Sequence, residues 1–356
     1  MHPTVRTGLF VWGIVLLAGC SDNDSSPIDT TDNGPLLESL ASHVVVGTYG
    51  DLKNRLVDLD AAINVWAASP GNQTLLDEAA AEWRSARVPW EASEAFLFGP
   101  AAFLSLDPAL DSWPVDHQQL ADVLASSFEL TPEFVAEGLG PLLRGFHTLE
   151  YLLFREGQPR QVTDITEREA DYLVAASAVL RADGHTLWAS WAEGLDGAQP
   201  YADEFALAGQ PGSRYTDSAS ALLELVEGMI GICDEVANGK IADPYDEQDP
   251  ALVESQFSFN SLADFADNLR SVQNVYLGGY HNGSDGPGLN DLVAERDPAL
   301  DTRIQAEITA AIAAILAIPA PFRNNLDAAA PIEAAQVAIT TVMNTLEQDL
   351  KPLVLE

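Results

Sequence analysis

Residues 145–150 read Gly-Phe-His-Thr-Leu-Glu and lie inside an apolar run that extends from residue 142 to residue 154. Apolar side chains occupy nearly every side of a helix built from this run, which is the pattern of a helix that packs on all sides. His147 and Glu150 are three positions apart, so both side chains leave one face and can reach one ion or one substrate. Because a buried ionisable group needs a partner, we expect this pair to organise a site.

Taken alone, the pair allows two interpretations. A histidine on an apolar helix is often a core residue whose ring is satisfied by a neighbour, and the His-x-x-Glu spacing also arises by chance. The sequence lacks the second histidine of the His-Glu-x-x-His motif, which supplies two zinc ligands and a base from one helix. A metal ligand pair and a buried structural pair therefore both stay open at this point.

The pattern of apolar residues is helical along most of the chain, and alternating runs that would indicate a sheet are few. We expect helices over residues 36–68, with a bend near 47–50, and over 74–98, 116–128, 141–154 and 167–193. The second half predicts helices over residues 216–238, 261–276, 299–318 and 332–351. The predicted fold class is all-α, with two helical-bundle domains.

The length of 356 residues exceeds the usual size of one core, which favours two domains. A shift to Gly, Pro, Gln, Asp and Tyr marks residues 196–215 as the linker between a bundle over 36–195 and a bundle over 216–356. Residues 84–99 and 270–279 both place an arginine on a helix that ends in an aromatic residue followed by glycine. An internal duplication is one explanation of this similarity.

The charge balance excludes one class of partner. The chain has 17 Lys and Arg residues against 54 Asp and Glu residues, for a formal net charge of -37. Such a surface repels phosphate backbones, so we expect no nucleic-acid partner.

The first residues have the pattern of a signal peptide rather than of a folded element. Residues 1–19 combine Arg6 with a short apolar run, and residues 17–20, Leu-Ala-Gly-Cys, resemble a bacterial lipobox whose Cys20 is acylated. Ser21 stands where an inner-membrane retention signal has Asp, which indicates the outer membrane, with the protein facing the periplasm. Residues 20–35 then form a flexible tether.

A second group of polar residues lies in the helix expected over 74–98. Arg87, Glu91 and Glu94 are spaced by four and three positions and share a face near Trp90. An exposed Arg87–Glu91 pair would be only a local ion pair, worth about 0.3–0.5 kcal/mol. If this face instead meets the helix of residues 145–150, Glu91 or Glu94 joins a mixed nitrogen and oxygen site of the kind that binds transition metals.

The hexapeptide at 145–150 is similar to the Gly-x-His-x-x-Glu motif of the imelysin family, also classified as M75 peptidases. Residues 87–100 resemble another strong block of that family, and residues 239–244, 255–261 and 286–293 resemble its second half. The resemblance covers roughly residue 36 to the C-terminus. It implies two helical bundles with the site near their junction.

The same resemblance implies the roles of individual residues. His147 and Glu150 correspond to the metal ligands proposed for the family, and Glu91 and Glu94 join them by analogy. The residues expected to shape the site are Arg87, Trp90, Gly145, Arg270 and His281. The implied cofactor is a divalent metal or iron.

Three functions are compatible with these observations. The first is a lipid-anchored periplasmic protein that binds a metal and serves iron uptake, together with other iron-uptake proteins. The second is a metallopeptidase of the M75 type, the insulin-cleaving membrane protease class, although no complete catalytic set is visible. The third is a docking protein for an outer-membrane partner, with His147 and Glu150 as a buried structural pair.

Overall fold

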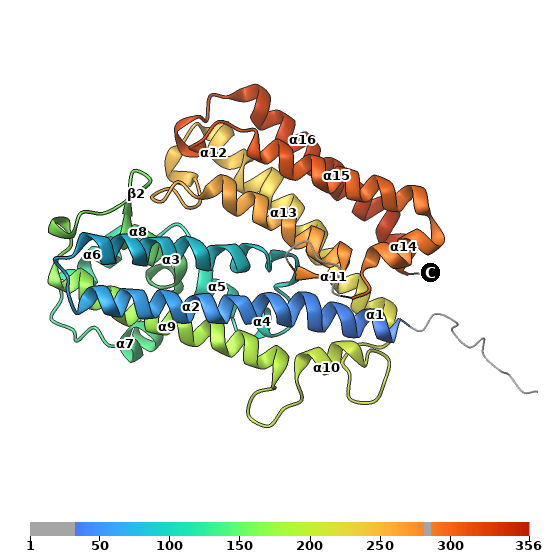
Figure 1. The fold of residues 1–356 in the computed structure, drawn as a ribbon, viewed down its shortest axis with the longest axis horizontal. Coiled ribbons are helices and arrows are strands. Elements are labelled where there is room, and N and C mark those ends of the chain that lie inside the picture. The colour runs from blue at the N-terminus through green and yellow to red at the C-terminus, as the bar shows by residue number, and fades with distance from the viewer. Residues whose placement is uncertain (1–32, 281–285, 356) are drawn as a thin grey trace, which may run out of the picture. The chain divides into compact units, whose positions relative to one another are not determined.

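The computed structural model describes residues 33–280 and 286–355. The predicted all-α class is confirmed: apart from a two-stranded antiparallel pairing of β1 with β2, the described residues form helices and their connections (Figure 1). The seven longest elements are α2 Gly47–Ala67, α3 Gln73–Glu91, α9 Glu167–Ala192, α11 Ser218–Glu235, α13 Ser261–Leu277, α15 Pro298–Leu316 and α16 Ala329–Thr345.

Shorter elements connect the long helices. In the first half they are α1 Gly34–Ser39, α4 Pro100–Phe103, α5 Leu106–Asp111, α6 His117–Ala125, α7 Pro132–Gly138, α8 Gly145–Leu153, β1 Phe154–Arg155, β2 Gln158–Pro159 and α10 Tyr201–Ala206. In the second half they are α12 Ala242–Glu247, α14 Leu289–Arg296 and α17 Lys351–Val354. The 3₁₀ turns are η2 Glu94–Phe96, η3 Pro141–Leu143, η4 Val162–Asp164, η6 Pro250–Leu252 and η8 Phe322–Asn324, and the π-helical segments are η1 Leu40–Val46, η5 Val236–Lys240 and η9 Leu346–Leu350.

Two groups of helices lie side by side. Helix α2 packs along α3 and α9, and α15 packs along α16 and α13 (Figure 1). Helix α13 also packs against α3, so the second half of the chain contacts the first through these two helices. The contacts between Cα atoms group the described residues into one compact unit. The division into two domains at residues 196–215 stays a prediction.

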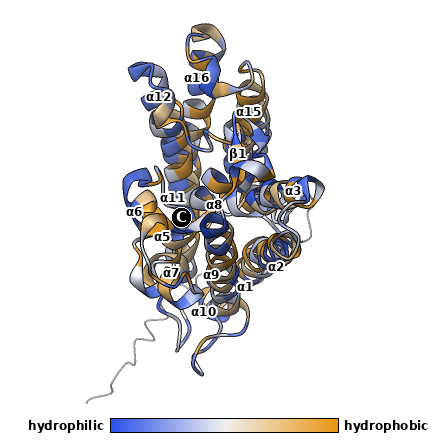
Figure 2. Cartoon of the chain, turned by 90° about the vertical axis from the view of Figure 1, so that its left-hand side faces the viewer, coloured by the Kyte–Doolittle hydropathy of each residue, from blue (hydrophilic) through white to orange (hydrophobic). Residues whose placement is uncertain are grey.

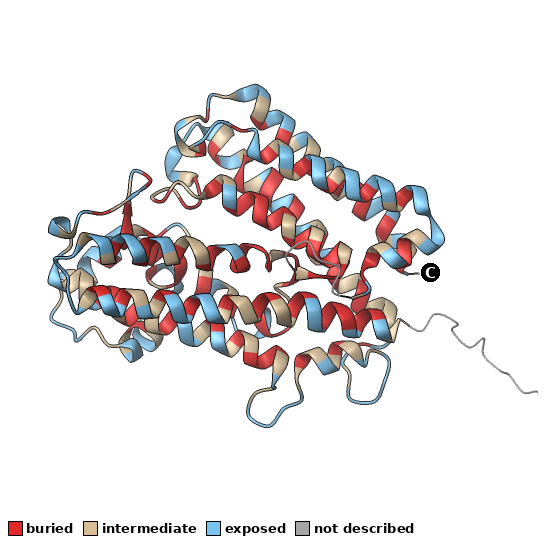
Figure 3. Ribbon diagram, viewed as in Figure 1, coloured by how far each residue is buried: buried red, intermediate tan, exposed pale blue. Residues whose placement is uncertain are grey.

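Most of the long helices bury one face and expose the other. Hydrophilic and hydrophobic residues both occur along α2, α3 and α15, as expected for helices with one face in a core (Figure 2). Helices α8 and α13 differ, because nearly every residue of α8 and most of α13 are buried (Figure 3). Within the described ranges, every helix is too short or too polar to cross a bilayer. Residues 1–19 and Cys20 lie outside the described residues.

Two predicted helix boundaries were wrong in ways that affect the site, and one long helix contains an irregular segment. In the helix over 36–68, where an irregularity was expected near 47–50, the π-helical segment Leu40–Val46 gives way to the α-helix at Gly47. The helix over 74–98 ends at Glu91, where Pro89 in the last turn lacks a backbone N–H donor, and Glu94 begins a separate 3₁₀ turn. Helix α8 begins at Gly145 rather than at residue 141, because Arg144 is extended.

Candidate metal centre

Gly145 lets the start of α8 lie against the end of α5. Its φ of +81° falls in the left-handed region, and a Cβ atom at this position would lie 2.4 Å from the Leu110 carbonyl oxygen. Only glycine avoids both the backbone strain and this overlap. The contact places His147, in the first turn of α8, beside Asp111, which is the last residue of α5.

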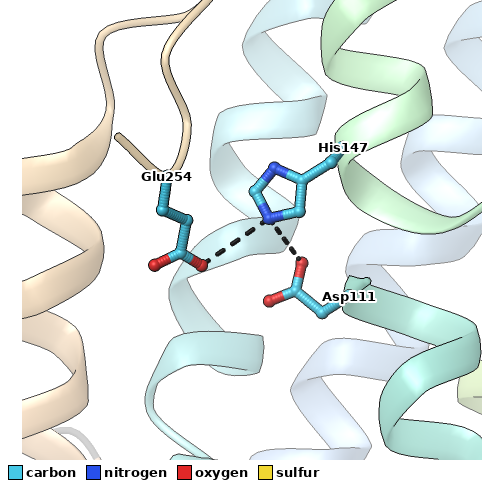
Figure 4. A group of neighbouring side chains, drawn as sticks. All are labelled: Asp111, His147 and Glu254. Carbon is cyan, nitrogen blue, oxygen red and sulfur yellow. Dashed lines mark ion pairs between the residues drawn. The ribbon is translucent and has the colours of Figure 1, made fainter. Parts of the chain in front are cut away.

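Three donor groups from distant parts of the sequence converge here (Figure 4). The Nε2 atom of His147 lies 3.1 Å from Asp111 Oδ1 and 3.6 Å from Glu254 Oε1. His147 and Glu254 are buried, Asp111 is partly buried, and one ligand atom from each lies within 4.8 Å of the others. Glu254 reaches the cluster from the segment between η6 and α13, where the next residue, Ser255, has a left-handed φ of 51°. The structure thus brings together an imidazole and two carboxylates.

Glu150 contacts the opposite side of the imidazole ring. Its Oε2 atom lies 3.1 Å from His147 Nδ1. Its Oε1 atom accepts hydrogen bonds from the backbone N–H groups of Phe257 (2.9 Å) and Ser258 (2.8 Å) and from the Ser258 hydroxyl (2.8 Å). The carboxylate is therefore held by the second half of the chain. In this position it orients the ring so that Nε2 faces Asp111 and Glu254.

The Arg87 guanidinium lies at the centre of the buried charges. It forms ion pairs with Glu91 and Asp111, and it lies 3.1 Å from Glu254 and 3.4 Å from Asp264. Its side chain is fully buried. A buried arginine of this kind is stable only when its charge is paired. The local pair with Glu91, expected from their spacing, is thus one part of a network that joins α3, α5 and α13.

Trp90 and Phe146 complete the wall beside this network. The indole Nε1 of Trp90 donates a hydrogen bond to Asp111 Oδ2 at 2.6 Å, so Trp90 and Arg87 both fix that carboxylate. The Phe146 ring packs against Trp90, with 6.2 Å between ring centroids, and against the Arg87 guanidinium at 5.2 Å. The Phe146 carbonyl accepts a hydrogen bond from the Trp83 indole at 2.9 Å, which ties α8 to α3.

The electrostatics of the cluster keep both carboxylates of the triad ionised. Burial alone would raise the pKa of Asp111, but Arg87 and then His147 outweigh it and hold the pKa well below its usual range. Burial is likewise outweighed at Glu254, where Lys240, His147 and Arg87 lower the pKa to about 2. Burial disfavours protonated His147, but Asp111 outweighs it and raises the pKa well above the ordinary histidine value. A metal ion at Nε2 must therefore displace a proton.

The other predicted site residues lie at varying distances from this centre. Glu91 is buried and accepts a hydrogen bond from Asn268, in addition to its pair with Arg87. Glu94 lies near it, and Glu91, Glu94 and Asp111 form a second group whose ligand atoms lie within 4.8 Å. Arg270 pairs with Asp267 on its own helix. His281 lies outside the described residues.

An acidic cavity of about 430 Å³ adjoins the cluster. Asp111 and Glu254 line it, so two of the three donor groups border the open space. Gly231 on α11 is exposed on its wall, and a Cβ atom there would meet nothing within 4 Å. The remaining lining residues are Glu94, Leu97, Phe98, Asp107, Trp113, Glu224, Glu227, Gly228, Ile232, Glu235 and Lys240.

Sequence reasoning missed Asp111, Glu254 and Lys240 as members of the site. Asp111 follows an irregular stretch without a recognisable pattern. Lys240 and Ser258 lie within the blocks 239–244 and 255–261, and Glu254 directly precedes the second block. Those blocks supported the family resemblance, and the polar residues in and beside them were the signal in the sequence that could have identified Lys240 and Glu254 as site residues. Spacing along the chain gave no means of pairing them with His147.

Comparison with known proteins agrees with the motif and with the fold. The family model described as imelysin, peptidase M75, matches residues 45–350. Iron-regulated protein A of Synechococcus elongatus is 31% identical over 324 residues, which cover 89% of this chain and 86% of the relative.

Two solved structures are similar. One is described as an iron-regulated protein A precursor from Parabacteroides distasonis, with 31% identity, a TM-score of 0.83, and coverage of 90% of this chain and 95% of that one. The other is an imelysin-like protein from Psychrobacter arcticum, with 14% identity, a TM-score of 0.72 and the same coverages, and it supports the fold alone.

Proposed function

The chain belongs to the imelysin family, and we propose that it is an iron-linked protein that binds a divalent metal ion through Asp111, His147 and Glu254. Iron-related function is supported by the relatives described as iron-regulated protein A. The observation that carries the metal site is the convergence of these three donors, two of them buried and each within 4.8 Å of the others.

The residues present fit a metal ion. His147 Nε2 is buried without a hydrogen bond of good geometry, although Asp111 Oδ1 is 3.1 Å away. Glu254 Oε2 is also buried without a hydrogen bond, and the Lys240 ammonium lies at ion-pair distance from it. One imidazole nitrogen with two carboxylates is a donor set that suits Fe²⁺, Mn²⁺ and Zn²⁺. A bound ion would use donor capacity that the protein leaves unsatisfied.

In this proposal Glu150 positions a ligand and does not act as one. Its carboxylate accepts the Nδ1–H of His147, so the Nε2 lone pair is available to the metal once the Nε2 proton has been displaced. Its other oxygen is occupied by Phe257 and Ser258. The assignment of Glu150 as a ligand, which the family resemblance implied, is replaced here by this supporting role.

Metal titration of the protein tests the proposal. We expect the full chain to bind about one Fe²⁺ under anaerobic conditions, and the variants Asp111→Asn, His147→Gln and Glu254→Gln each to weaken binding by at least about tenfold. His185→Gln is the matched control, since His185 stacks on Trp188 away from the cluster. The proposal is wrong if His147→Gln and His185→Gln bind the ion equally.

A second candidate function is supported by the description of the family as peptidase M75. Three protein ligands and an open position characterise catalytic zinc sites. This function predicts chelator-sensitive cleavage of a protein substrate that is lost in His147→Gln but retained in His185→Gln. Intact substrate after long incubation with the zinc-loaded protein counts against it.

We propose that Cys20 is lipid-acylated and anchors the chain to the outer membrane, facing the periplasm, where iron-uptake proteins are its partners. The support is the sequence Leu-Ala-Gly-Cys at residues 17–20 and Ser21 after it. Mass spectrometry of the mature N-terminus should detect an acylated cysteine, and Cys20→Ser should release the protein from membranes. A mature chain that begins elsewhere contradicts the anchor.

A further inference from the structure

We infer that Lys240 is a built-in competitor of the metal ion: its ammonium neutralises the carboxylates of the site and thereby lowers the affinity for external cations. The inference rests on the proposed metal site and names a residue that tunes it. Its role is separate from that of the three donors, because a lysine ammonium at this position offers positive charge and no lone pair.

The position of the ammonium supports this role. Lys240 Nζ lies 3.1 Å from Glu254 Oε2, 3.6 Å from Glu235 Oε1 and 3.8 Å from Glu91 Oε2. The side chain is 3% exposed. A cation surrounded by carboxylate oxygens from three parts of the chain occupies the kind of environment that a metal ion would seek.

The positive charge of Lys240 lies in the wall of a cavity whose other charged lining side chains are acidic. Among the described residues that line the cavity, Lys240 is the single lysine or arginine. The carboxylates that share the lining with it are Glu94, Asp107, Asp111, Glu224, Glu227, Glu235 and Glu254. A cation that enters from solvent through this cavity therefore meets strong attraction, opposed at the inner wall by Lys240.

Lys240 is the last residue of the π-helical segment that follows α11. Residues Val236–Lys240 form a π-helical segment at the end of α11, and Ile241 N–H donates to the Val236 carbonyl at 3.1 Å. Lys240 is buried on the same side of the helix as Cys233 and Val236, while Asn238, two residues earlier, is exposed and bonds Asp234.

The alternative is that Lys240 only holds η5 to the segment of Glu254. Removing one partner of a buried ion pair destabilises a protein in either case. The two roles differ in what a metal ion does afterwards. If Lys240 competes with the metal, its loss must make the site more attractive to cations, because opposite charges interact strongly at short range in a poorly solvated site.

The test compares Lys240→Met with wild type, using Mn²⁺ as the probe, by calorimetric titration and by thermal unfolding. We expect Lys240→Met to be less stable than wild type without metal, to bind Mn²⁺ at least about tenfold more tightly, and to gain more in Tm when Mn²⁺ is added. Lys240→Arg keeps the charge and should retain wild-type affinity.

Controls separate the possible failures. Lys53→Met removes the same charge from a lysine that lies over Trp188, and it should bind Mn²⁺ as wild type does. Equal or weaker binding by Lys240→Met overturns the inference while leaving the metal site intact. If wild type itself binds no Mn²⁺ and no Fe²⁺, the proposed function fails instead. If Lys240→Met and Lys240→Gln both fail to fold, Mn²⁺ should restore folding, and failure to do so overturns the inference.

Discussion

Gly145 and Leu110 meet backbone to backbone, so that a Cβ atom on Gly145 would lie 2.4 Å from the Leu110 carbonyl oxygen. This contact joins the start of α8 to the end of α5. The close packing explains why the motif has glycine at this position, and the same packing places His147 Nε2 3.1 Å from Asp111 Oδ1. The site therefore depends on a residue that contributes no side chain.

Gly145→Ala should destabilise the fold by at least about 2 kcal/mol, because it adds backbone strain and a steric overlap with Leu110. Gly140→Ala is the matched control. Gly140 has a φ of -74° and a Cβ atom there would meet nothing within 4 Å, so little change is expected. Urea unfolding of the two variants checks the difference, and equal stability would refute the packing role of Gly145.

Glu150→Gln should weaken metal binding by about 10- to 100-fold while changing stability much less than a core truncation would. The amide oxygen can still accept from Phe257 and Ser258, but the amide N–H₂ then faces His147 Nδ1. The ring must place its proton on Nε2, where the metal would bind. Fe²⁺ titration measures the effect, with the exposed Glu78→Gln as control. Unchanged affinity would mean that Glu150 does not set the tautomer.

Asp267 should make stability depend on pH. Burial, partly offset by Arg270, raises its pKa to about 6, against about 3.9 in an unfolded chain. Since the folded state holds the proton more tightly, the charged form costs stability, and the cost develops as pH rises from about 4 to about 6. Asp267→Asn should therefore be more stable than wild type by about 1–2 kcal/mol at pH 8 and show no such gain at pH 4.

Urea unfolding at both pH values tests the Asp267 prediction. The exposed Asp246→Asn serves as control and should change stability little at either pH. A loss of stability in Asp267→Asn that is the same at pH 4 and pH 8 would show that the bond to Arg270 outweighs the burial of the carboxylate.

Two glycines of α11 that line the cavity should respond to alanine in opposite directions. A Cβ atom at Gly228 would lie 2.1 Å from the Ala95 carbonyl oxygen, so Gly228→Ala should destabilise by about 2 kcal/mol or more. Gly231 has open space, so Gly231→Ala should stabilise by up to about 1 kcal/mol through helix propensity. Thermal unfolding checks the pair; a stable Gly228→Ala would contradict the close packing of α11 on η2.

Much of the fold was predictable because the spacing of apolar residues within a short stretch of sequence is enough to indicate a helix. The long helix over residues 167–193 is observed as Glu167–Ala192, and the helix over 261–276 is observed as Ser261–Leu277. Boundaries failed where a single backbone feature decided them, as at Pro89 and Arg144. The end of α3 at Glu91 places Glu94 in a separate 3₁₀ turn, and no periodic pattern marks that point, although the Glu94 carboxylate still lies near those of Glu91 and Asp111.

By itself the sequence determined the helical class, the family and the local pair His147 and Glu150, since a spacing of three on a helix is a short-range property. Only the tertiary structure decided what the pair does. Glu150 faces the backbone of Ser258, and His147 Nε2 faces Asp111 and Glu254, which lie far from it along the chain. Residues so distant in sequence meet through the packing of α3, α5, α8 and α13, and the burial that results gives the charges of Arg87 and Lys240 their effect.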